Sequence, residues 1–144
     1  MSSGADVLRL VAVRDGPLSV DEVLAAVRDE AAGGTVVFLG SVRREDGGRG
    51  VRRLGYSAHP SVLNAMRAIA GRVAGGHPVR ALAAVHRVGE LAVGDLAVVV
   101  AVACPHRGEA FAACRELVDE IKHEIPVWKH QVFTDGGEEW VGSA

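Results

Sequence analysis

The chain has 144 residues, enough for one domain, and its 49% hydrophobic content is sufficient for a sizeable core. The formal net charge of −2 argues against general nucleic-acid binding, which requires a basic surface. No apolar run approaches the roughly 18 residues of a membrane-spanning helix, which also excludes proteins that cross the membrane with such a helix. We therefore expect residues 1–144 to form a single domain.

The N-terminus and the cysteines indicate where the protein works. Met1–Asp6 lacks a basic region followed by an apolar stretch, so it is unlike a secretory signal, and a cytoplasmic location is expected. The two cysteines, Cys104 and Cys114, lie in apolar segments and do not make a disulfide framework. We expect both to be small buried residues rather than redox or metal-binding groups.

The first elements alternate strand, helix and strand. Residues 7–13 predict a strand, and a capping box at Ser19–Glu22 opens a helix that continues to about Arg28. The β-branched run 35–39 predicts a short buried strand.

A loop rich in Arg, Asp and Gly follows that strand. We expect residues 40–50 to form a mobile loop able to fold over a ligand, with Arg43 as the residue that binds an anion. A solvated turn explains the same residues equally well. The alternation in residues 51–58 predicts the second arm of a hairpin, and Pro60 suits the first turn of a following helix.

Two further strands are predicted at residues 79–88 and 96–103. The second is almost continuously apolar, which is typical of a central strand. Arg87, at the end of the first, suits a salt bridge as well as a ligand contact. The turn after the second strand contains His106 and Arg107 immediately before a helix, and a helix N-terminus favours anions. A solvated turn is the alternative there.

The only two lysines, against 14 arginines, lie close together at Lys122 and Lys129. A lysine amine can act as a nucleophile or a proton donor, whereas a guanidinium stays charged. Chance proximity on a solvated helix end is the alternative. The helix that carries Lys122 has an apolar stripe predicted to lie on the core, made of Phe111, Cys114, Leu117, Val118, Ile121 and Ile125.

Lys122 projects just past the edge of that stripe, so its amine can point into a cleft. Pro126 ends the helix, and Lys129 and Gln131 alternate with His130 in the strand that follows. A sharp turn between helix and strand is expected to bring the two lysines to one site.

Several motifs occur in order over most of the chain. They are Phe38–Arg43, His86–Leu91 with Val93-Gly94, Pro105–Phe111, Asp119–Lys129, Asp135-Gly136 and Trp140-Val141. Together they make the sequence resemble the MoaE family, the large catalytic subunits of molybdopterin synthase. The resemblance implies an α/β (α+β) hammerhead-type fold with a mostly antiparallel sheet and packed helices.

The resemblance also implies the activity and the partners. Such an enzyme takes sulfur from the C-terminal Gly-Gly thiocarboxylate of a small ubiquitin-like subunit and inserts it into cyclic pyranopterin monophosphate (precursor Z). The product is the dithiolene of molybdopterin, and the assembly is a homodimer within a heterotetramer. No metal and no bound cofactor are implied.

Carried over by motif, the implied catalytic residues are Lys122 and Lys129. The implied substrate pocket comprises Ser41, Val42, Arg43, His106, Arg107, Lys122, Lys129, His130 and Gln131. The sequence departs from the family pattern at Gly55, Ser57 and His59, which affects expected partner or dimer contacts more than the pocket.

Two other functions compete with sulfur transfer. A non-catalytic module would bind a ubiquitin-like tail or a phosphorylated ligand in the same basic cleft. A phosphoesterase would use His106 as acid or base, but the chain offers no metal-ligand cluster for it.

Overall fold

The computed structural model describes residues 7–142. The prediction made for Met1–Asp6, that they are no secretory signal, lies outside the described residues. Among the helices of residues 7–142, none is both long and apolar enough to cross a bilayer.

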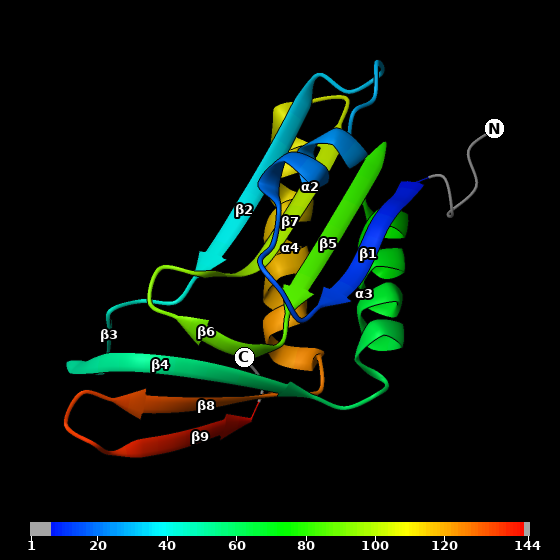
Figure 1. The fold of residues 1–144 in the computed structure, drawn as a ribbon. Coiled ribbons are helices and arrows are strands. Elements are labelled where there is room, and N and C mark those ends of the chain that lie inside the picture. The colour runs from blue at the N-terminus through cyan, green and yellow to red at the C-terminus, as the bar shows by residue number, and fades with distance from the viewer. Residues whose placement is uncertain (1–6, 143–144) are drawn as a thin grey trace.

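One of the two sheets has, over the described residues, four strands in the order β1-β5-β7-β2 (Figure 1). These are β1 (Leu8–Arg14), β5 (Ala81–Arg87), β7 (Leu96–Cys104) and β2 (Gly34–Ser41). β1 and β5 are parallel, whereas β7 is antiparallel to both of its neighbours. The apolar strand predicted to be central is β7, and the prediction is confirmed because β7 lies between β5 and β2.

Helices cover both faces of this sheet. α2 (Val20–Ala26) lies on one face, and α3 (Val62–Gly76) and α4 (Arg107–Glu124) lie on the other (Figure 1). Ser19 caps α2 by accepting a hydrogen bond from the Glu22 amide, as the capping box predicts. Alternate residues of β7 therefore enter two separate apolar cores, which explains its unbroken apolar sequence.

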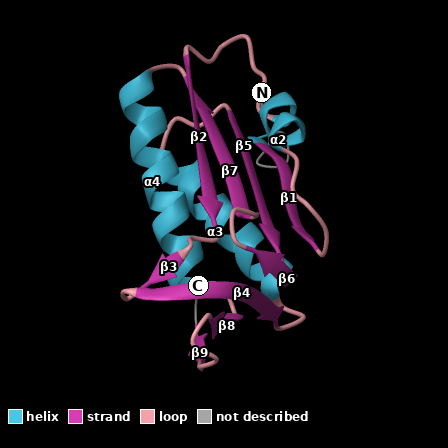
Figure 2. Cartoon of the chain, turned by 60° about the vertical axis from the view of Figure 1, so that its left-hand side comes forward, coloured by secondary structure: helices cyan, strands magenta, loops and turns pink. Residues whose placement is uncertain are grey.

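The second sheet is antiparallel, has five strands among the described residues, and lies crosswise at one end of the first (Figures 1 and 2). It contains β3 (Glu45–Asp46), β4 (Arg49–Ala58), β8 (Val127–Phe133) and β9 (Glu138–Gly142), with β6 (Gly89–Ala92) also paired to β4. The structure is thus α+β with mostly antiparallel strands, and the predicted fold class is confirmed.

The segment expected to be a mobile loop forms a tight hairpin instead. β3 and β4 pair directly, and the turn between them has positive φ at Gly47 (59°) and Gly48 (80°). Two consecutive positive φ angles define the turn type that matches the twist of a two-residue hairpin, and glycine adopts them without strain. The glycines therefore close a hairpin that holds Asp46 in a defined place.

Two expectations about burial are wrong, and both errors lie along one edge. β2 is an edge strand. Val37 and Leu39 lie on the same sheet face as α2 but are exposed, because α2 packs on β1, β5 and β7 and not on β2, so only alternate residues of β2 are covered. Phe111, placed on the buried stripe of α4, is 62% exposed beside this strand. Periodicity identifies an apolar face but not where the sheet beneath it ends.

The packing of α4 gives a test by matched leucines. We expect Leu117→Ala to lower the free energy of unfolding by about 2–5 kcal/mol, because it leaves a cavity in a fully buried site. Leu24→Ala makes the same change at an exposed position of α2 and should lower the free energy of unfolding by clearly less. Urea denaturation measures both, and equal losses would contradict the packing of α4 described above.

Candidate functional site

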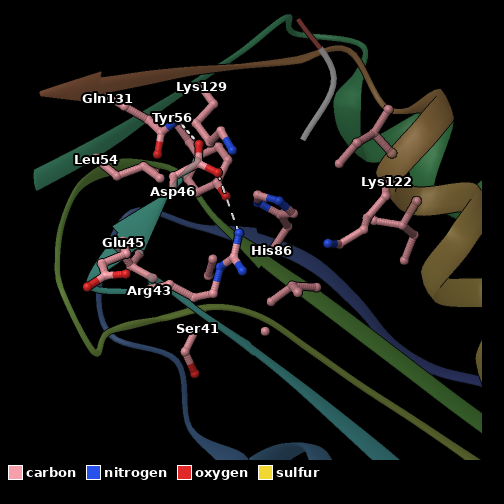
Figure 3. A pocket seen from close by; sticks show the side chains of 16 residues that line it. Ser41, Arg43, Glu45, Asp46, Leu54, Tyr56, His86, Lys122, Lys129 and Gln131 are labelled. Carbon is pink, nitrogen blue, oxygen red and sulfur yellow. Dashed lines mark hydrogen bonds and ion pairs between the residues drawn. The ribbon is translucent and has the colours of Figure 1, made fainter. Parts of the chain in front are cut away.

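A pocket lies where the two sheets meet the C-terminal end of α4 (Figure 3). Its wall combines residues from α4, from β8, from the end of β2 and its hairpin, and from β4 and β5. Its polar and charged side chains are those of Ser41, Arg43, Glu45, Asp46, Tyr56, His86, Lys122, Lys129 and Gln131.

The two lysines reach this pocket from consecutive elements, as predicted. α4 ends at Glu124, and Ile125 already has an extended backbone (φ −73°, ψ 142°), which is the conformation that the following Pro126 favours. β8 begins at once with Val127. Lys122 therefore points into the pocket from the last turn of the helix, and Lys129 points into it from the strand (Figure 3).

The alternation of β8 decides which of its side chains enter the pocket. Lys129 and Gln131 line it, whereas His130 does not. Successive side chains point to opposite faces of a strand, and the ring of His130 stacks on Trp140 on the other face, with centroids 4.3 Å apart. The Nε2 atom of His130 also lies 2.7 Å from a carboxylate oxygen of Glu138. The structure thus separates His130 from the predicted pocket.

Ser41, Val42 and Arg43 line the pocket where β2 ends. The Arg43 guanidinium lies 3.5 Å from the carboxylate of Asp46, but its side chain is 78% exposed. A pair that exposed is weak, since solvent screens it and side-chain entropy opposes it. Arg43 therefore remains free to exchange this partner for a ligand anion.

Asp46 is held more firmly by Gln131. The buried amide of Gln131 donates to Asp46 over 2.7 Å. This hydrogen bond, with smaller contributions from the positive charges of Lys129 and Arg43, lowers the pKa of Asp46 below its ordinary value, although burial opposes the shift. The carboxylate is therefore ionised at neutral pH and fixes the position of the hairpin at the pocket rim.

His106 and Arg107 lie at the opposite end of α4. His106 precedes the helix and Arg107 is its first residue, whereas Lys122 is in its last turn. At about 1.5 Å per residue, Arg107 and Lys122 are roughly 22 Å apart along the helix axis. Within one chain, these residues are not brought to the pocket that contains the lysines.

Tyr56 and His86 belong to the pocket but were absent from the predicted set. Their rings meet edge to face, with centroids 5.0 Å apart and an interplanar angle of 89°. The alternation of β4 predicts that Tyr56 faces inward, but not which cavity it enters. Arg87 pairs with Asp95 over 3.4 Å, so it forms a salt bridge and lies outside the pocket wall.

Both cysteines are buried, as predicted. Burial raises the pKa of Cys104, with a smaller contribution from Glu109, and burial raises the pKa of Cys114 to about 11. The thiolate is the nucleophilic form, so neither residue is activated for sulfur chemistry at neutral pH. In residues 7–142, no three His, Cys, Asp or Glu side chains are grouped to hold a metal ion.

The departures from the family pattern lie away from the pocket. Gly55 and Ser57 alternate along β4 with Leu54 and Tyr56, which line it. They pair with His130 and Trp128 of β8, whose side chains share that outer face. We therefore expect these departures to affect contacts on the outer face of the sheet rather than ligand binding.

A family model described as MoaE protein matches residues 13–124, which is most of the chain. The chain belongs to the MoaE family. It is 46% identical over 129 residues to the molybdopterin synthase catalytic subunit 1 of Mycobacterium tuberculosis, a match that covers 89% of this chain and 87% of that protein. The resemblance identified from sequence motifs is therefore confirmed.

Solved structures agree with this membership of the MoaE family. The molybdopterin synthase structure from Staphylococcus aureus superposes with a TM-score of 0.84 at 30% identity, covering 90% of this chain and 95% of that one. A Helicobacter pylori complex of subunits 1 and 2 of molybdopterin-converting factor has a TM-score of 0.70 at 21% identity, covering 92% and 89% of the two chains. The latter shows a shared fold.

The lowered pKa of Asp46 predicts how acid affects the protein. Asp46→Asn keeps an acceptor for Gln131 but removes the charge, so the variant should be less stable at neutral pH. The stabilisation by the carboxylate is complete above the unfolded pKa of about 3.9 and disappears as the pH falls through the folded value.

The free energy of unfolding of the two proteins should therefore converge between about pH 5 and pH 2. Urea denaturation across this range measures the difference. A difference in the free energy of unfolding that stays constant as the pH falls would show that the charge of Asp46 does not stabilise the fold.

Proposed function

We propose that this chain is a molybdopterin synthase catalytic subunit. It takes sulfur from the thiocarboxylate of a small ubiquitin-like partner and transfers it to cyclic pyranopterin monophosphate, forming the dithiolene of molybdopterin. The observation that carries the proposal is the convergence of Lys122, Lys129 and Arg43 on one pocket. Membership of the MoaE family and the names of its relatives support the same activity.

The charge of the pocket suits an anionic ligand. Arg43, Lys122 and Lys129 contribute three positive charges, and Glu45 and Asp46 contribute two negative ones. The Gln131 amide holds Asp46 in place without removing its charge, so the pocket keeps a surplus of one positive charge. Fixed cations aimed at a phosphate and a thiocarboxylate bind the ground state and stabilise charge that develops during the reaction.

We assign separate roles to the two lysines. Lys122, at the helix end beside the pocket opening, positions the partner's tail and assists proton transfer as sulfur attacks the substrate. Lys129 binds the substrate and supplies a proton when the ring opens. Ser41, Val42 and Gln131 complete the wall, with Gln131 also holding Asp46 in place.

His106 and Arg107 are proposed to act across a homodimer. A twofold axis that passes beside the middle of α4, perpendicular to it, would place the two helices antiparallel and bring these residues of one copy near Lys122 of the other. Val37 and Phe111 are exposed where β2 lies beside α4, and they offer an apolar surface for such contact.

Charge supports this arrangement. One chain gives the pocket a surplus of one positive charge, whereas the substrate and the thiocarboxylate bring two anions. Arg107 of a second copy would add the missing cation. The whole chain would then act as one catalytic unit within a homodimer that binds two small subunits, and the Helicobacter pylori protein of the same fold is itself described as a complex of two subunits.

The first experiment replaces Lys122 in a reconstituted reaction with precursor Z and a thiocarboxylated partner. Lys122→Ala should lower dithiolene formation by about a hundredfold or more, because the proton-transferring amine is lost. Lys122→Arg keeps the charge but has no removable proton, so it should also be slow. Arg67→Ala removes an exposed cation from α3 and should react like the unmodified protein.

Near-normal turnover by Lys122→Ala at saturating partner would contradict the assigned role. If the unmodified protein binds its partner but forms no product, the chain is a binding module rather than an enzyme. Release of phosphate from simple esters without any partner would instead favour a phosphoesterase.

Subunit exchange tests the shared site. Arg107→Ala and Lys122→Ala should each be inactive as homodimers. A mixed dimer carries both changes in one site and neither in the other, so it should recover roughly half of the normal turnover per dimer. An absence of recovery after confirmed exchange would place His106 and Arg107 outside the reacting site.

A further inference from the structure

The imidazole of His86 faces the pocket, and the proposed reaction gives it no role. The residue is 3% exposed, and its ring packs against the edge of Tyr56. It lies at the end of β5, next to Arg87, in the centre of the view in Figure 3. A histidine this buried must satisfy its two ring nitrogens in defined ways.

The hydrogen bond of Nδ1 determines where its proton lies. Nδ1 of His86 is 2.7 Å from the backbone carbonyl oxygen of Arg87. A carbonyl oxygen can only accept, so Nδ1 carries the hydrogen and donates it. In the neutral ring, Nε2 then has a lone pair and acts as an acceptor.

Nε2 reaches the open space of the pocket. In residues 7–142, His86 shows no hydrogen bond at Nε2, and the fully buried side-chain atoms without a partner are Nε of Arg87 and an oxygen of Glu109. Nε2 is therefore neither bonded within the chain nor sealed in the core. Because His86 lines the pocket, a ligand there can meet this atom.

The surroundings favour the neutral ring. Burial lowers the pKa of His86, and the hydrogen bond to the Arg87 carbonyl opposes this only in part. Charged and titratable groups face the same pocket from every element around it: Lys122 from α4, Lys129 from β8, Arg43, Glu45 and Asp46 from the segment after β2, and Tyr56 from β4. Three of them are cations and two are carboxylates, and burial remains the largest cause of the lowered pKa of His86.

We propose that His86 is a further substrate-contacting residue, whose Nε2 accepts a hydrogen bond from an uncharged N–H or O–H group of the pterin. This inference rests on the proposed function. The cations attract the phosphate of the substrate, whereas the lone pair of Nε2 repels it. His86 and the cations therefore discriminate between the two ends of the substrate and set its orientation.

The role has a consequence for pH. Protonation converts Nε2 from an acceptor into a donor and adds a positive charge beside the pterin. Substrate affinity should fall as the pH falls through the pKa of His86, which burial lowers from the ordinary histidine value. The cyclic phosphodiester keeps its single charge over this range, so the change belongs to the protein.

Two amide variants separate the two nitrogens. His86→Asn places a donor where Nδ1 lies and keeps the bond to Arg87, but it has nothing at the position of Nε2. His86→Gln reaches that position with an oxygen that accepts. Binding of purified cyclic pyranopterin monophosphate is measured by calorimetry, and KM and kcat are measured in the reconstituted reaction.

We expect His86→Asn to weaken substrate binding about tenfold to a hundredfold, since a ligand donor is left without its partner. Partner affinity should stay unchanged. His86→Gln should keep most of the substrate affinity and lose its acid dependence. Folded His86→Asn with normal substrate affinity would overturn the proposal, even if turnover confirms the proposed function.

The remaining outcomes are also decisive. If the unmodified protein binds the pterin but makes no dithiolene, the proposed function fails. The substrate affinity of His86→Asn, compared with that of the unmodified protein, still decides the role of His86. If His86→Asn does not fold, the acid dependence decides instead: an identical dependence in the unmodified protein and His86→Gln would overturn the inference. Absence of pterin binding by the unmodified protein would overturn it as well.

Discussion

The pocket depends on the abrupt change from helix to strand at Pro126. This proline cannot continue α4, and it holds the preceding Ile125 in an extended conformation. The carbonyl of Pro126 accepts a hydrogen bond of 3.0 Å from the amide of His59, and Val127 pairs with Ala58 in the adjoining strand. The chain is therefore fixed to β4 as soon as the helix ends.

This junction connects the two layers of the molecule. α4 is anchored on the sheet of β1, β5, β7 and β2 by buried residues such as Leu117 and Ile121, while β8 belongs to the second sheet. Lys122 and Lys129 are thus carried by two elements whose relative position both sheets determine. Such a frame can hold two amines at one ligand without either lying on a free loop.

Much of the fold and part of the site follow from the sequence. The capping box, the apolar run of β7 and the proline after α4 are local signals, and each is found where it was predicted. His130 was placed in the pocket because the family motif is continuous, although strand alternation points it to the opposite face. His86 was overlooked because only tertiary structure brings β5 to the pocket.

The exposure of Phe111 and the separation of Arg107 from Lys122 have a common origin. Phe111 lies beside the edge strand β2, where the sheet ends, and Arg107 and Lys122 lie at opposite ends of one continuous helix, so neither feature follows from the apolar pattern of α4. Periodicity predicts an apolar face whether the chain itself or a second copy covers it. The sequence therefore predicts which residues carry charge better than it predicts which of them share one pocket.

The most direct measurement is a crystal structure of this protein with cyclic pyranopterin monophosphate bound. We expect the phosphate beside Lys122, Lys129 or Arg43, and the pterin ring directed toward Nε2 of His86. A ligand bound only in the apolar groove between β2 and α4, or away from both lysines, would contradict the assignment of this pocket as the site of sulfur transfer.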